Sequence, residues 1–463
     1  MMNAKAGEMW IRLIRRWDAI AAILIVLAAT VTKIVSASMP AHAVMPPSPP
    51  MPAVNARDYY DAASARLVEP DRIRLMVGDV SPSAGRGIAV DLIASPGDRE
   101  RLANENAPAI ATLRQGMPYA FEYPALRSYP LNLRDLKGDH DLADLLELDS
   151  RVRSNKGDYA GAMRDCLDCM RLAYDLPHGG DLDIMPTSEL CDRIGRLAAT
   201  DLVDRLNAGN ARADAKRLEK IDSSAVPTWQ SLQYTEWEMQ GALLNLFRQP
   251  HWRETFLDMS DDDGLGFHAT NSTEAYPVSY AQLSTRERTA RAYAAEFVLN
   301  CESASAAYGN CTRYMDQAIA REKLPWPARR NVSEPKAPND PISQALLQVY
   351  DRATFEQCLA FALDRLLDTR LALRAYRLDH GRYPDSVAQL APAYLSRVPL
   401  DPFTGGAPLK YRPSGAGYVL YSIGPDAVDD GGTPIDFSYD LSNETYSEAI
   451  EHAKGDIVAE AVD

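Results

Sequence analysis

The stretch from Leu371 to Asp430 constrains the fold most, because it carries an ordered series of helix-stop, turn and strand signals. Upstream of it and within it, Leu366, Leu373 and Tyr376 follow helical spacing. The helical pattern ends at Gly381, a residue type that readily takes the left-handed conformation and so satisfies the last carbonyls of a helix. A long helix ending close to this glycine is therefore expected.

Turn residues and two strand-like segments follow that helix. Tyr383-Pro384 redirects the backbone, Ser386 can cap the short helix VAQL, and Asp401-Pro402 imposes another turn. The segments LKYR and YVLYS then nearly alternate in polarity and contain aromatic and β-branched residues, with PSGAG between them. They predict an antiparallel pair of strands whose buried face rests on the long helix.

This stretch resembles the C-terminal region of the major pseudopilins of type II secretion systems. In that family a sequence like DNGRYP ends the helix, a DP turn precedes the sheet, and an acidic loop after YSLGPDG binds calcium. The matching segments here are Asp379–Pro384, Asp401–Phe403 and Tyr421–Asp426. The resemblance covers under a sixth of the chain, and it implies a small sheet over a long helix.

Three carboxylates stand at the position of the family's calcium loop: Asp426, Asp429 and Asp430. The resemblance implies that they are metal ligands and that the cofactor is Ca²⁺. Their close spacing suits a hard cation that prefers oxygen ligands, and Gly424 and Gly431 allow tight curvature. The alternative is a solvated acidic turn without a metal.

The N-terminal part departs from the pseudopilin pattern. Gly7-Glu8 offers no matching leader site, and residues 55–337 separate the apolar N-terminal segment from the long helix. Assembly into a filament by helix stacking is therefore not expected. We interpret the tail as a module carried by an anchored helical protein.

A membrane anchor is predicted at the N-terminus, within residues 1–36. Lys5, Arg12, Arg15 and Arg16 precede an apolar run from Ala19 to Val35 that is interrupted only by Lys33. Such a run can cross a bilayer, and the positive residues favour a cytoplasmic N-terminus. The prediction is a single-pass protein of the bacterial inner membrane, whose membrane partner is this helix and whose bulk is periplasmic or otherwise extracytoplasmic.

A cleavable signal peptide is the alternative, because Ala41-His42-Ala43 has the small-x-small form of a cleavage site. The proline-rich linker 37–54, with MPPSPPMP at its centre, is expected to be an extended, semi-rigid tether, since proline lacks an amide donor. Either interpretation exports the bulk of the chain to a compartment where disulfides can form.

Residues 55–337 are expected to form a helical domain. The clearest helical patterns run from Asp141 to Arg153 and from Tyr159 to Leu176, joined by SNKGDYAGAM, which resembles the turn of one tetratricopeptide-type hairpin. A generic helical hairpin is the alternative. Further helices are expected at Ser188–Leu206, Thr228–Phe247, Arg286–Glu302, Asn310–Ala320 and Ser343–Asp379.

The cysteines are expected to be structural. Cys166 and Cys169 share one face of a helix, which favours core packing or a disulfide over a zinc or redox site, because zinc needs two more ligands. Cys301 and Cys311 flank AAYGN, a predicted turn, and could clip a helical hairpin.

Taken together, the sequence predicts a mainly α fold with a small α+β C-terminal unit at 338–440 and an acidic tail at 441–463. A net charge of −15 argues against a nucleic-acid partner. The sequence contains no HExxH, GxSxG or phosphate-binding glycine loop, so no catalytic residue is predicted. The expected function is a non-catalytic interaction or assembly component of the envelope or of a secretion system. Its expected partners are other envelope or secretion proteins, and the alternative is an anchored envelope hydrolase.

Overall fold

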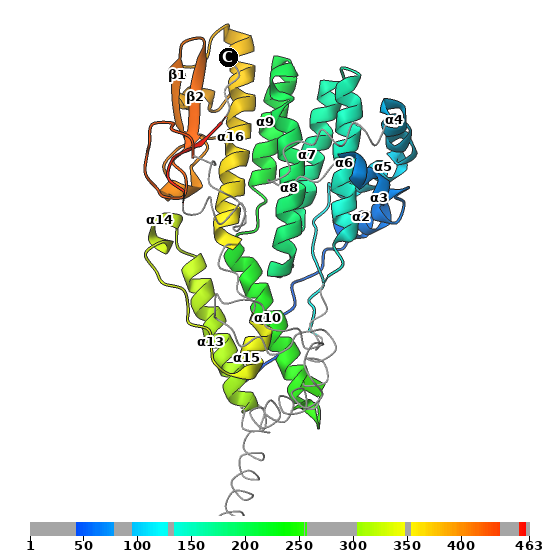
Figure 1. Cartoon of the computed structure of the whole chain (residues 1–463), viewed down its shortest axis with the longest axis vertical. Helices are drawn as coiled ribbons and strands as arrows, with labels where there is room; N and C mark the ends of the chain where they lie inside the picture. Colours follow the sequence, from blue (N-terminus) through cyan, green and yellow to red (C-terminus); the bar gives the residue numbers. More distant parts are fainter. Residues whose placement is uncertain are drawn as a thin grey trace, which may run out of the picture.

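The computed structural model describes residues 43–77, 95–127, 134–253, 255–256, 303–347, 353–435 and 453–459. Its centre is a layer of upright helices that stand side by side (Figure 1). This layer consists of α6 (Lys137–Asn155), α7 (Tyr159–Asp175), α8 (Met185–Thr200), α9 (Ala208–Asp222) and α16 (Ala353–His380).

Helices α6 and α7 form the predicted hairpin. Gly157, in the link between them, has φ +80°, a conformation that favours glycine. The Asp158 side chain then caps α7 by accepting a hydrogen bond from the amide of Gly161. The helical hairpin is therefore confirmed, whereas its resemblance to a tetratricopeptide unit remains a prediction.

The predicted cysteine-bearing face of α7 is buried. Cys166 Sγ lies 3.2 Å from Ser150 Oγ on α6, and Cys169 Sγ donates to the carbonyl of Cys191 on α8 at 3.1 Å. Burial raises the pKa of both α7 thiols, to about 12 for Cys166, which disfavours the thiolate that metal or redox chemistry needs. Both are free cysteines that pack in the core.

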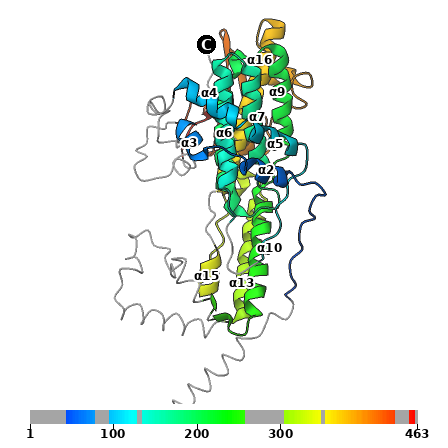
Figure 2. The same ribbon diagram turned by 90° about the vertical axis from the view of Figure 1, so that its right-hand side faces the viewer.

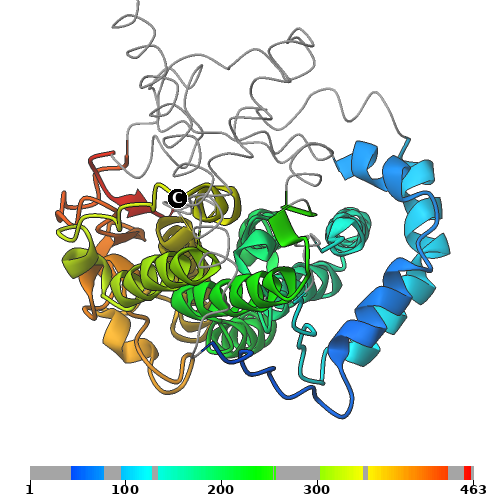
Figure 3. The same cartoon turned by 90° about the horizontal axis from the view of Figure 1, so that it is seen from below.

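Short helices cover the α6 side of the layer, as the view from below shows (Figure 3). They are α2 (Ala56–Ser64), α3 (Pro70–Val77), α4 (Pro96–Glu105) and α5 (Ala107–Gly116). Arg114 of α5 reaches α7 and pairs with Asp165 and Asp168. These ion pairs and the burial of Ile73, Leu102 and Leu113 join the covering helices to the central layer.

A second core lies at one end of the molecule (Figure 2). It is built from α10 (Thr228–Phe247), α13 (Ala304–Glu322) and α15 (Pro341–Leu346), and α14 (Trp326–Arg329) connects α13 to α15. Residues 306–310 lie inside α13, so the predicted turn between Cys301 and Cys311 is wrong. Cys311 Sγ lies 3.2 Å from Ser343 Oγ, and Cys301 is outside the described residues.

Two helix boundaries differ from prediction. The expected helix Ser343–Asp379 stops after Leu346, because Leu347 is extended, and Leu346 packs against the second core rather than under the sheet. The expected helix Ser188–Leu206 ends at Thr200 and is followed by the 3₁₀ turn η3 (Val203–Arg205). The helix expected at Arg286–Glu302 lies outside the described residues.

Helix α16 supports the C-terminal unit as expected. It ends at His380, the next residue, Gly381, has φ +70°, and Ser386 caps η5 (Val387–Leu390). Strands β1 (Lys410–Ser414) and β2 (Gly417–Ser422) pair antiparallel, with Tyr411 opposite Leu420. A third strand, β3 (Ile457–Val458), pairs antiparallel with the other edge of β2. A mainly helical fold with a small antiparallel sheet near the C-terminus is thus confirmed, and the sheet also uses part of the predicted acidic tail.

Within the part of the chain that the structure describes, no helix is both long and apolar enough to span a bilayer. The predicted anchor at 19–35 lies outside these residues.

Asp401 joins the turn before the sheet to strand β2. This buried carboxylate accepts hydrogen bonds from the Phe403 amide in η6 (Pro402–Thr404), from Ser422 Oγ and from the Ile423 amide, at 2.8 to 3.0 Å. Because Asp401 is 1% exposed, losing it leaves these donors buried without an acceptor.

Asp401→Ala should therefore destabilise the protein by about 2–4 kcal/mol, the usual cost of removing a charged acceptor from buried donors. Asp385→Ala is the control, because Asp385 is exposed and its carboxylate pairs with the exposed side chain of Arg382. Chemical denaturation of both variants measures the difference, and equal stability of the two would contradict this role of Asp401.

Candidate functional site

The predicted metal loop follows β2, and strand β1 holds one of its carboxylates. Asp429 accepts a hydrogen bond from Tyr421 Oη at 2.9 Å, and one of its oxygens lies 2.9 Å from Lys410 Nζ. The hydrogen bonds from Lys410 and then from Tyr421 hold the pKa of Asp429 below its usual value. Asp429 is therefore ionised and already has a cationic partner.

The other two predicted ligands, Asp426 and Asp430, are both held through their main-chain carbonyl oxygens. Arg330, next to α14, donates to the carbonyl oxygen of Asp426, and the Asp426 carboxylate accepts from the amide of Val428 at 3.1 Å. Thr433 Oγ1 donates to the Asp430 carbonyl oxygen at 2.8 Å. Contacts with protein groups thus fix all three predicted ligand residues.

Asp456, which sequence analysis placed in the acidic tail, is a further acidic residue of this loop. Its buried carboxylate accepts from the Gly432 amide at 2.7 Å, and its own amide donates to the Thr433 carbonyl. Burial raises its pKa, and nearby Asp429 acts in the same direction. In the sequence, only Gly455 indicates that the chain turns next to Asp456. Its φ is +111°, and its backbone lies against Ile435.

Asp426, Asp429 and Asp430 share one loop but do not surround a common point. Among the described residues, no three histidine, cysteine or acidic side chains are arranged to hold a metal ion. Calcium binding by these three residues remains a prediction, and it requires Asp429 to exchange Lys410 for the ion. The present geometry fits the alternative, an acidic turn fixed by protein groups.

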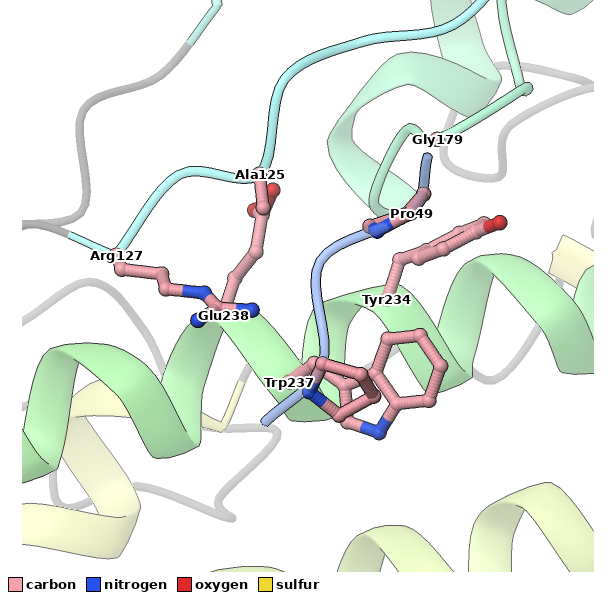
Figure 4. Close-up of a pocket in the computed structure, with 8 residues that line it drawn as sticks. Pro49, Ala125, Arg127, Gly179, Tyr234, Trp237 and Glu238 are labelled. Carbon is pink, nitrogen blue, oxygen red and sulfur yellow. The ribbon is translucent and has the colours of Figure 1, made fainter. Parts of the chain in front are cut away.

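The proline-rich segment lies against the body of the protein. Pro47 and Pro49 line a small pocket together with Tyr234 and Trp237 of α10 (Figure 4). The two aromatic rings are 5.6 Å apart and nearly perpendicular. Aromatic side chains commonly receive extended proline-rich segments, because such segments have little conformational entropy left to lose. The described part of the segment is therefore docked rather than free, and its extended, semi-rigid character stays a prediction.

Polar contacts secure both sides of this docking site. Asn55 donates to the Glu122 carbonyl oxygen at 2.7 Å and accepts from the Glu122 amide at 3.2 Å. Glu238 of α10 accepts from the Leu126 amide and from Arg134. Burial, with the neighbouring Asp181, raises the pKa of Glu238 to about 9. Residues 121–127 are thereby held on α10 and form one wall of the pocket.

A second, small and partly open cavity of about 40 Å³ lies between α7, α8 and α16. Its lining combines acidic, aromatic and aliphatic side chains: Tyr174, Pro177, Met185, Ser188, Glu189, Asp192, Ala225, Val226, Gln357, Ala360 and Phe361.

A buried pair of carboxyl groups stands at the inner side of this cavity. Arg196 Nε lies 3.3 Å from Asp192 Oδ2 and 3.1 Å from Asp364 Oδ1, and Tyr174 Oη donates to Asp364 Oδ2 at 2.6 Å. Burial raises the pKa of both carboxyls, and the proximity of Asp192 raises that of Asp364 further. One guanidinium between two buried carboxyls favours a state in which the pair retains a proton.

Glu189 and Glu356 form a similar pair nearer the first turn of α16. Burial and the proximity of Glu356 raise the pKa of Glu189 well above its usual value. Sequence analysis named none of these acids. Helices α8 and α16 are far apart in the chain, and the sequence does not distinguish an acid that will be buried between helices from one that will face solvent.

Trp237→Ala should release the proline-rich segment from α10, because it removes one of the two rings in the pocket. We expect a proline-specific endopeptidase to cut the full-length variant between residues 43 and 54 roughly tenfold faster than wild type, since local opening exposes the backbone. Trp229→Ala on the same helix is the control, as Trp229 contacts Lys323 instead. Equal cleavage rates in wild type and Trp237→Ala would contradict docking.

Calcium should raise the Tm of the full-length protein relative to a chelator if the loop binds it. Lys410→Ala should enlarge this rise, because it removes the cation that competes for Asp429. Asp429→Asn should abolish it. An unchanged Tm in both wild type and Lys410→Ala at millimolar calcium would exclude the loop as a calcium site.

Comparison with known proteins adds no relative. No family model matches the chain, and no curated protein and no solved structure matches it either. The functional argument therefore depends on the residues and contacts described above.

Proposed function

We propose that this chain is a membrane-anchored extracytoplasmic protein that acts by binding other proteins of the envelope or of a secretion system, without catalysis. The observation that carries this proposal is the way the acidic loop is held. Lys410 of β1, Arg330 beside α14 and Asp456 next to β3 all fix it. A loop fixed in this way presents a defined surface and loses little conformational entropy when a partner binds.

The tip of this loop has the character of a contact surface. Val428 is 52% exposed and lies between Ala427 and Asp429. Asp429 and Asp430 beside it are exposed as well, so an apolar point is surrounded by negative charge. A partner with a small apolar pocket and a basic rim would complement it.

The part of the proposal that concerns the membrane anchor depends on the sequence. The apolar run at 19–35 supplies the anchor, and the proline-rich segment follows it directly. Because that segment is docked at Tyr234 and Trp237, the body would be held close to the segment that leaves the membrane. This arrangement suits a component with a fixed place in an assembly.

The alternative of an anchored hydrolase has weaker support. Hydrolysis by paired carboxyls needs one group to give a proton to the substrate and another to act as base or nucleophile. Asp364 and Asp192 do converge, yet Tyr174 and Arg196 already occupy oxygens of that pair. Binding therefore explains the accessible surface better than catalysis does.

Val428→Asp should reduce the recovery of co-purifying envelope proteins by about tenfold or more, because it places a charge at the centre of the contact. The measurement is affinity purification of the full-length protein from membranes, followed by mass spectrometry of the partners. Val68→Asp is the matched control, since Val68 is also an exposed valine, at 39%, but lies between α2 and α3. If both variants recover the wild-type partners equally, the loop is not the contact surface.

A further inference from the structure

The burial of residues 43–55 repeats every third position. The buried or half-buried positions at this spacing are Ala43, Pro46, Pro49, Pro52 and Asn55, and apart from Met45 the residues between them are exposed. A polyproline II helix has about three residues per turn, so positions three apart lie on one side of it. In a β-strand, burial would alternate at every second residue instead. The repeat therefore indicates that one side of a polyproline II helix lies on the body of the protein.

The backbone of this segment supports the same conformation. Within the part of the chain that the structure describes, no hydrogen bond joins the backbone of residues 43–54 to another residue. Polyproline II has no internal hydrogen bonds and a solvated backbone, whereas a strand in a sheet depends on pairing. The rings of five residues also fix φ close to the polyproline II value, namely Pro46, Pro47, Pro49, Pro50 and Pro52.

The groove that receives the segment is held together by contacts of its own. The half-buried rings of Tyr234 and Trp237, three residues apart on α10, form one wall (Figure 4). Residues 121–127 form another wall, which Glu238 and Asn55 hold through the hydrogen bonds described above. None of these wall contacts involves a residue before Asn55. The groove is therefore expected to persist when residues 43–52 leave it.

We propose that this groove is a binding site for polyproline II peptides, and that residues 43–52 occupy it as a releasable strap of the same chain. Aromatic side chains favour such ligands because a polyproline II segment has little conformational entropy left to lose. The strap has no hydrogen bond to the described body before Asn55, so its local opening requires much less free energy than unfolding of the core. This inference does not depend on the proposed function of the acidic loop.

Docking of the strap determines where the fixed part of the chain begins. With the strap in the groove, the chain is held from its first described residues, and with the strap released the first held residue is Asn55, which donates to the Glu122 carbonyl oxygen. The ten residues 43–52 span about 30 Å in the polyproline II conformation. Release would let the body move by a distance of this order relative to the chain before residue 43.

Binding of a separate peptide tests the site. The probe is a fluorescently labelled peptide with the sequence of residues 43–54. The receptor is the full-length protein with Pro46→Ser and Pro49→Ser, which weaken the strap of its own chain. We expect fluorescence anisotropy to show at least about tenfold tighter binding to this released variant than to wild type, where the tethered strap competes at high effective concentration. Adding Trp237→Ala to the released variant should weaken peptide binding about tenfold or more, because it removes one of the two rings.

Two adjacent prolines provide a matched control for the peptide. Pro49 lines the groove, whereas Pro50 is exposed. Pro49→Ser in the peptide should weaken its binding to the released variant about tenfold or more, and Pro50→Ser should change it by less than about twofold. A peptide that binds the released variant no better than wild type, or that tolerates both replacements equally, would overturn the proposal.

The same pair of positions gives a second measurement that needs neither the peptide nor the released variant. Proteinase K should cut full-length Pro49→Ser within residues 43–54 roughly tenfold faster than full-length Pro50→Ser, because only the first loosens the strap. Equal cleavage rates in the two variants would show that the segment is not held at every third residue, and the proposal would fail.

Discussion

Burial of helix α16 on more than one side is the constraint on which the rest of the structure depends. Its flanks contact α9 and α8 of the central layer, and β2 with the η6 turn covers another side. Leu367 and Leu371, one turn apart, share one side of the helix and Leu373 lies on the opposite side, yet all three are at most 2% exposed. Such a helix has no free face, so the helical body and the C-terminal sheet must share one core.

Polar residues buried along α16 require specific partners. Asp364 meets Tyr174 and Arg196, and Thr369 donates to the carbonyl of Arg365 one turn earlier. A buried ion pair adds little net stability, because desolvation offsets most of the attraction, but breaking one is expensive. Asp364 thus favours one alignment of α16 against α7 and α8.

Local signals in the sequence predicted the elements that end or turn within a few residues. Gly157, Gly381 and Ser386 act as helix stops and caps as expected, because each works through its own backbone or its immediate neighbours. The strand pair β1–β2 was predictable for the same reason. The break after Leu346 was not, since Leu347 carries no proline or glycine signal and the turn depends on packing against α13.

Features that depend on distant contacts were beyond sequence analysis. Asp456 contacts the acidic loop because the neighbouring strand β3 pairs with β2. A strand of two residues is too short to be predicted from sequence. The docking of Pro47 and Pro49 depends on Tyr234 and Trp237, which as isolated aromatic residues on a helix are indistinguishable from ordinary core residues. The cavity acids are invisible for a related reason, because only the fold brings α8 and α16 together.

The shared core changes how the C-terminal unit should be regarded. Trp326, Phe355 and Phe403 pack with ring centroids 5.4 to 6.4 Å apart, and they join α14, α16 and the turn before the sheet. Trp326 also donates to the Pro425 carbonyl oxygen at 2.9 Å, at the base of the acidic loop. The unit is therefore integrated into the body rather than attached through a flexible linker. A partner that contacts the loop would meet a surface whose orientation the whole helical layer determines, and such preorganisation favours specific assembly over loose tethering.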